Sequence, residues 1–144
     1  MLELFETIHK KHPGCTQHDI KELEKGLAQL GFENLAISKT YAAFLMESNG
    51  GIFTNGKRAF QLFSSDEVLA VYKEYHFADF MPYALPISLD GSGNFSLFDY
   101  RKPNNETIYC ASAGNLGWEQ DEVFLLADNF TDFLTQKDEL FDYM

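Results

Sequence analysis

The chain has 144 residues, of which 45% are hydrophobic and 23% charged, and its net charge at pH 7 is −11. This length predicts a single domain, and this composition excludes an intrinsically disordered chain. An acidic excess disfavours binding to nucleic acids and to anionic membranes, both of which need a basic surface. No apolar run approaches the roughly 18 residues of a membrane span, and residues 1–10 lack the basic start of a secretory signal, so we expect a cytoplasmic protein.

The acidic residues are concentrated in the second part of the chain. Residues 1–60 hold seven basic and seven acidic residues, so residues 61–144 carry the whole charge of −11. Residues 119–144 alone hold eight acidic residues and one lysine. The negative electrostatic field of these residues would attract a basic protein and speed its association with this chain. The alternative is that the acidic residues only keep the protein soluble.

Apolar residues at helical spacing predict helices in the first third of the chain. The first covers residues 2–11 and ends before Pro13. The second begins after Thr16, which forms a capping-box pattern with Asp19, and ends at Gly31.

A third helix begins after Ser38 and is closed by Asn49-Gly50-Gly51, where glycine accepts a positive φ. Its apolar stripe consists of Tyr41, Phe44 and Leu45. A further helix follows Ser64 or Ser65, with Val68, Leu69 and Tyr72 on one side.

The second half of the chain alternates short apolar runs with turn residues, which is typical of an antiparallel meander. The predicted strands cover residues 59–63, 87–89, 95–100, 107–111 and 123–127. The turn Asp90-Gly91-Ser92-Gly93-Asn94 joins two of them. A final helix after Asp128 or Asn129 has the inward-facing residues Phe130, Phe133, Leu134 and Phe141. The fold class expected is α+β: an antiparallel sheet flanked by N-terminal helices and a C-terminal helix.

Searches for catalytic and metal-binding motifs find none, so no catalytic residue, metal or cofactor is expected. The turn after Asp90 lacks the later Glu of a calcium loop and the lysine of a phosphate loop. No Gly-x-Ser-x-Gly elbow is present, and Cys15 and Cys110 are interpreted as free thiols. The remaining candidate for catalytic residues is a carboxylate pair of Asp90 and Asp99 across the hairpin, which would fit a small hydrolase.

Trp118 is the only tryptophan and lies in a Gly-rich loop between two predicted strands. One interpretation makes it a contact anchor with an acidic rim, and the other makes it a lid folded back on the core. The acidic residues assigned with it to a partner-binding surface are Glu119, Asp121, Glu122, Asp132, Asp138 and Glu139.

Four segments together resemble the SUKH superfamily, which includes bacterial toxin-immunity proteins and the yeast glucan-synthesis regulator. They are Asp19-Ile20 through Leu30-Gly31, Tyr41-Ala-Ala-Phe44-Leu45 with Asn49-Gly50-Gly51, Ile87-Ser-Leu-Asp90-Gly-Ser-Gly93-Asn94 with Phe98-Asp99, and Ala127-Asp-Asn-Phe130-Thr-Asp-Phe133-Leu134. They span about residues 16–134. The resemblance implies an α+β fold, a binding role and no catalytic residues.

The favoured hypothesis is a non-catalytic immunity protein that neutralises a cognate toxin. The partner would be a basic protein, and a nuclease fits because it carries basic charge to grip phosphate. The alternatives are a regulatory or scaffold protein linked to cell-wall glucan synthesis, implied by the yeast relative, and a small hydrolase.

Overall fold

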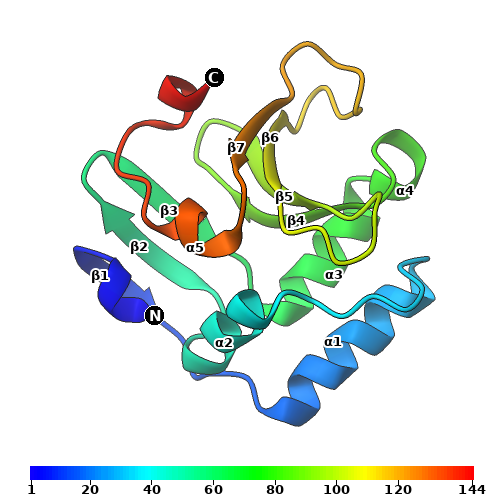
Figure 1. The fold of residues 1–144 in the computed structure, drawn as a ribbon, viewed down its shortest axis with the longest axis horizontal. Coiled ribbons are helices and arrows are strands. Elements are labelled where there is room, and N and C mark those ends of the chain that lie inside the picture. The colour runs from blue at the N-terminus through cyan, green and yellow to red at the C-terminus, as the bar shows by residue number, and fades with distance from the viewer.

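A seven-stranded antiparallel sheet, whose strands follow one another in chain order, forms the centre of the protein (Figure 1). The computed structural model describes residues 1–144. The strands are β1 (Thr7–Lys11), β2 (Gly51–Asn55), β3 (Arg58–Leu62), β4 (Ala84–Leu89), β5 (Asn94–Asp99), β6 (Ile108–Ser112) and β7 (Phe124–Ala127). The expected α+β fold is confirmed.

Five α-helices flank this sheet, and Figure 1 shows α1, α2 and α3 together on one side of the view. They are α1 (Gln17–Gln29), α2 (Lys39–Glu47), α3 (Ser65–Glu74), α4 (Phe77–Phe80) and α5 (Phe130–Leu134). Short 3-10 helices cover Leu2–Leu4 and Leu140–Tyr143. None of the helices combines the length and the apolar character that crossing a membrane requires.

The helices begin where the sequence places their caps. Thr16 accepts a hydrogen bond from the backbone N–H of Asp19, whose carboxylate accepts one from Thr16 in return. Ser64 forms the same reciprocal capping box with Glu67. These side chains satisfy backbone N–H groups that the first helical turn leaves without partners.

The sheet is covered on both faces at its centre, because successive strand residues point to opposite sides. On one face, Phe98 of β5 packs against Tyr41 of α2, with ring centroids 5.3 Å apart. On the other, Phe95 of β5 packs against Phe77 of α4 and Tyr75, at 5.2 and 4.9 Å. All six residues of β5 are therefore buried.

The Asn49-Gly50-Gly51 segment both ends α2 and positions α3. Gly50 has a φ of +82°, and a Cβ there would lie 2.7 Å from the carbonyl oxygen of Leu62. The Asn49 side chain accepts a hydrogen bond from the backbone N–H of Ser65, the first residue of α3. The motif thus connects two helices across the start of β2.

The helix predicted over residues 2–11 is wrong. This segment forms the 3-10 turn Leu2–Leu4 and then β1, which pairs with β2 from Thr7 opposite Thr54 to Lys11 opposite Gly51. Backbone pairing with a distant strand overrides the local apolar spacing. Ile8, one of the apolar residues whose spacing predicted that helix, is 46% exposed.

The predicted C-terminal helix is too long. α5 ends at Leu134, and Phe141, which was expected inside, is 57% exposed. The chain turns away because the buried amide of Gln136 donates to the carbonyl of Leu126 and accepts from Arg58. Strand β2 and helix α4 were not predicted.

The sheet opens between β3 and β4. These strands share a single paired position, Leu62 opposite Ser88, whereas β2 and β3 pair at five positions. The two strands diverge on the side of the Asp90–Asn94 turn, so the sheet is split there into β1–β3 and β4–β7.

Candidate functional site

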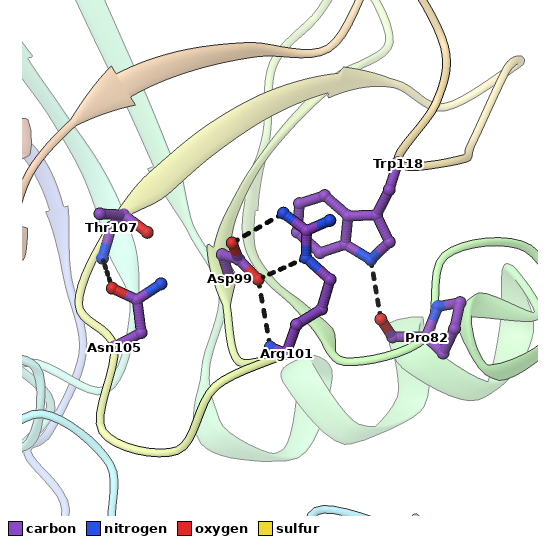
Figure 2. A network of polar contacts seen from close by, with 6 residues as sticks. All are labelled: Pro82, Asp99, Arg101, Asn105, Thr107 and Trp118. Atoms are coloured by element: carbon purple, nitrogen blue, oxygen red, sulfur yellow. Dashed lines mark hydrogen bonds and ion pairs between the residues drawn. The ribbon is translucent and has the colours of Figure 1, made fainter.

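Trp118 lies in the loop that joins β6 to β7, and its ring is half-buried. The indole N–H donates a 2.8 Å hydrogen bond to the carbonyl of Pro82, in the segment before β4 (Figure 2). The edge of Tyr109 from β6 meets the ring at 5.7 Å between centroids. One end of the indole is thus bound to the protein, and the ring also packs against the core.

The face of the indole is occupied by Arg101. Figure 2 shows its guanidinium over the Trp118 ring, 3.8 Å from the centroid, with the Asp99 carboxylate beside it. Asp99 accepts two hydrogen bonds from that guanidinium, each of 3.0 Å, and a third of 3.1 Å from the backbone N–H of Arg101. This bidentate ion pair between the guanidinium and the carboxylate holds the Arg101 side chain in one orientation.

The Asp99–Arg101–Trp118 stack is a preorganised unit. The Asp99 side chain is only 9% exposed, whereas that of Arg101 is 46% exposed. Hydrogen bonding to Asp99 raises the pKa of the Arg101 guanidinium, so it stays charged. A cation on an indole face adds about 0.5–1 kcal/mol at such exposed sites. The Trp118 ring packs on the core and remains partly exposed to solvent, so a role as a contact anchor stays a prediction.

Exposed aromatic residues surround this loop. Phe80 is 60% exposed and Tyr83 45%. Tyr75, Phe80 and Leu116 line a hollow of about 350 Å³ between the α3–α4 corner and the β6–β7 loop. Neither Phe80 nor Tyr75 was assigned to the site from the sequence, because the left-handed turn at His76, with φ of +56°, ends α3 and starts α4 and so sets the direction of both side chains.

The acidic residues assigned to partner binding lie in two separate groups. The loop acids, Glu119, Asp121 and Glu122, follow Trp118 directly and are exposed. The C-terminal acids, Asp132, Asp138 and Glu139, are exposed on α5 and on the segment after it. Figure 1 shows the β6–β7 loop and α5 in different parts of the molecule. The structure therefore brings only the loop acids to Trp118.

Hydrogen bonds within the β6–β7 loop order its acidic tip. The Asn115 amide donates to Glu122 at 3.0 Å and to Gln120 at 3.2 Å. Glu119 and Asp121 make no side-chain hydrogen bond or ion pair and face solvent. Their charges are free to act on an approaching molecule.

The Asp90–Asn94 segment is a tight hairpin turn. The Asp90 carboxylate accepts hydrogen bonds from the backbone N–H groups of Ser92 and Asn94, at 2.9 and 2.8 Å, and from the Asn94 amide at 3.2 Å. Asp90 therefore positions the turn, and Gly91 lies exposed at its tip.

The carboxylate pair considered for a hydrolase is not formed. Asp99 pairs with Ala84 at one end of the hairpin, whereas Asp90 follows Leu89 at the other. Ala84 and Leu89 are five positions apart along the strand, which corresponds to roughly 17 Å. Each carboxylate is held by its own neighbours, so the two cannot act on one bond. No three His, Cys, Asp or Glu side chains lie close enough to share a metal ion.

The family model of the SMI1/KNR4 family (SUKH-1) matches residues 14–136 of the chain. The chain belongs to this family, which confirms the resemblance found over about residues 16–134. A search of the curated proteins found no match. Membership supports an immunity-like or regulatory role, and the family is generally non-catalytic.

Proposed function

We propose that this chain is an immunity-type protein that binds and blocks a basic toxin domain through the surface around Trp118. The observation that carries the proposal is the stack of Arg101 on Trp118 beside exposed aromatic residues and the loop acids. A half-buried aromatic residue that is already ordered loses little conformational entropy when it is covered.

The charge of the chain supports the same partner. A nuclease toxin carries basic charge to grip phosphate, so an acidic loop is complementary to its active face and would exclude the substrate. Charges at the rim of an interface mainly set the association rate, whereas buried aromatic anchors set dissociation. The loop acids and Trp118 therefore have separable roles.

The test compares two variants with the same change in charge. Glu119 and Asp121 are reversed to Lys in one, and Asp138 and Asp142 in the other. Glu122 and Asp132 are left unchanged, because Glu122 accepts from Asn115 and Asp132 belongs to the N-terminal cap of α5. Both variants raise the net charge equally, so only the position of the charge differs.

Each open reading frame adjacent to this gene is expressed alone and together with this chain. We expect one to encode a basic polypeptide whose toxicity the chain suppresses. With that polypeptide purified, E119K/D121K should slow association and flatten its salt dependence, whereas D138K/D142K should leave both unchanged. Equal association rates for both variants and the wild type would contradict the charge argument.

Trp118→Ala should act on dissociation instead. Loss of a hot-spot aromatic residue costs about 2 kcal/mol, which corresponds to ~30-fold faster dissociation. Stopped-flow fluorescence follows binding of the wild type directly, because Trp118 is the chain's only tryptophan. Unchanged dissociation of the Trp118→Ala variant, measured by surface plasmon resonance, would place the interface away from this loop.

A further inference from the structure

The split between β3 and β4 encloses a cavity of about 170 Å³ that is open to solvent on the side of Lys57 and Glu139. Beyond the single paired position at Leu62 and Ser88, these two strands form no ladder. Of the four buried polar residues that line the cavity, Asn94 is bonded to Asp90, which leaves the side chains of Arg58, Ser88 and Ser96. The site does not involve the Trp118 loop, so it is independent of the function proposed above.

Strand register places these three side chains on one face of the sheet. Arg58 and Leu62 of β3 are four residues apart and therefore point to the same side. Ser88 is paired with Leu62, and Ser96 is paired with Ser88, so both share that side. Three strands thus direct one guanidinium and two hydroxyl groups to a single place.

Arg58 is 4% exposed, and no carboxylate lies within ion-pair distance of it. One guanidinium nitrogen donates a 3.1 Å hydrogen bond to the neutral amide oxygen of Gln136. Its central carbon also lies over the rings of Phe60, Phe133 and Tyr143, 5.0, 5.4 and 6.0 Å from their centroids. An arginine side chain stays protonated even when buried, so this is an unpaired charge inside the protein.

The two serine hydroxyls also lack partners. Ser88 is 7% exposed and Ser96 3%, and neither hydroxyl takes part in a hydrogen bond within the protein. The nearby carboxylate of Asp90 already accepts three hydrogen bonds from its own turn. Arg58 therefore has no anionic partner of its own, and the two free hydroxyls beside it can donate to a group that supplies one.

We propose that this cavity binds a carboxylate group, with Arg58 as its ion-pair partner and Ser88 and Ser96 as hydrogen-bond donors. A carboxylate is planar and matches the edge of a guanidinium. Lys57 and Arg58 are balanced by Asp90 and Glu139 around the cavity, so a singly charged anion is favoured over a doubly charged phosphate. The cavity exceeds the ~30 Å³ share of one water, which leaves room for the stem that carries the carboxylate.

The carboxylate comes either from a free small molecule or from the C-terminus of another polypeptide chain. Both sources present the same chemistry to Arg58. The experiment therefore first tests the carboxylate itself and then separates the two sources.

The chain has only two arginines, so its Arg side-chain N–H spectrum contains one signal from Arg58 and one from Arg101. Arg101→Lys assigns them by removing one. We expect sodium acetate, added at constant ionic strength against sodium chloride, to shift the Arg58 signal saturably and to leave the Arg101 signal in place. Equal, non-saturating shifts of both signals, or no shift of Arg58, would overturn the proposal.

Ser96→Ala keeps the charge and removes one hydrogen-bond donor. Acetate should bind this variant ~10-fold more weakly, as expected for a hydrogen bond to a charged group. Ser92→Ala in the exposed turn is the matched control and should bind acetate as the wild type does. Unchanged binding by Ser96→Ala, or tighter binding of inorganic phosphate than of acetate by the wild type, would contradict the assigned geometry and ligand class.

The two sources are compared with an acetylated tri-alanine peptide. If its free-acid form binds at least tenfold more tightly than acetate, and its C-terminal amide does not bind, the carboxylate belongs to a polypeptide. If the free acid binds no better than acetate, the source is a small molecule. Binding of the amide as strongly as the free acid would overturn the role of Arg58.

Discussion

The hydroxyl of Tyr41 is buried in the aromatic core without a hydrogen-bond partner. The ring packs against Phe98 and Phe130, with centroids 5.3 and 5.1 Å away. Burial raises the pKa of this phenol above its ordinary value, because the charged form would lie in an apolar environment. The ring stabilises the core, whereas the hydroxyl carries an uncompensated desolvation cost.

Tyr41→Phe should therefore raise the free energy of unfolding by about 1 kcal/mol, because it removes an unsatisfied polar group and keeps the ring. Phe44→Ala is the contrast, since it empties a fully buried position and should cost about 3–5 kcal/mol. Urea unfolding followed by circular dichroism measures both. A loss of 1 kcal/mol or more in Tyr41→Phe would show that the hydroxyl has a partner in solution, such as an ordered water.

At the scale of the element, the β4–β5 hairpin depends on backbone conformation more than on side-chain contacts. Gly93 has a φ of +82°, and a Cβ at this position would meet no atom within 4 Å. A side chain there would be penalised by the left-handed backbone alone. Gly91 in the same turn is equally open but has no such φ.

Gly93→Ala should destabilise the protein by about 1–2 kcal/mol, the cost of the left-handed conformation for a residue with a Cβ. Gly91→Ala should stay within about 0.5 kcal/mol of the wild type. Thermal and urea unfolding of the pair separate conformational strain from the effect of an added methyl group. Equal stability of the two variants would mean that the turn relaxes to a different type.

At the scale of the whole molecule, the charge of −11 lies entirely in residues 61–144 and makes the folded chain repel itself. The three loop acids lie near one another on an exposed loop and contribute to this repulsion between negative charges. Exposed charges are screened by salt over about 8–10 Å at physiological ionic strength. Part of the stability should therefore depend on salt.

Raising NaCl from about 10 to 300 mM should increase the Tm of the wild type. E119K/D121K should increase the Tm at low salt, and its advantage should shrink as salt is added, because screening removes the same repulsion. Differential scanning fluorimetry measures this and also shows that the variant used in the binding test is folded. A Tm that is independent of salt in both proteins would show that self-repulsion is negligible.

The parts of the fold that were predicted correctly depend on neighbouring residues. Capping at Thr16 and Ser64 is a contact over three residues, and the Asp90–Asn94 turn closes within five. The parts that were missed depend on remote partners. Residues 7–11 form a strand because their backbone pairs with the edge of β2. The final helix ends because the side chain of Gln136 forms hydrogen bonds with Leu126 and Arg58.

The site shows the same division. The sequence predicted Trp118 and the loop acids as partner-binding residues, because a lone tryptophan in a Gly-rich acidic loop is visible without a structure, and this assignment stays a prediction. It could not indicate that Arg101 covers the indole or that Pro82 accepts its N–H, since these residues come from separate segments. It also grouped the loop acids with the C-terminal acids, which the fold keeps apart.

By itself, the sequence determined the fold class, the family, most helix starts and the acidity of the second part of the chain. The family follows from the resemblance of four motif segments, and the rest follows from composition, periodicity and contacts over a few residues, which are all local properties. Only the tertiary structure decided which charges share a surface and that Arg58, Ser88 and Ser96 meet at one cavity. The physical reason is that strand pairing joins residues far apart in the chain, and a register is set by the packing of the whole sheet.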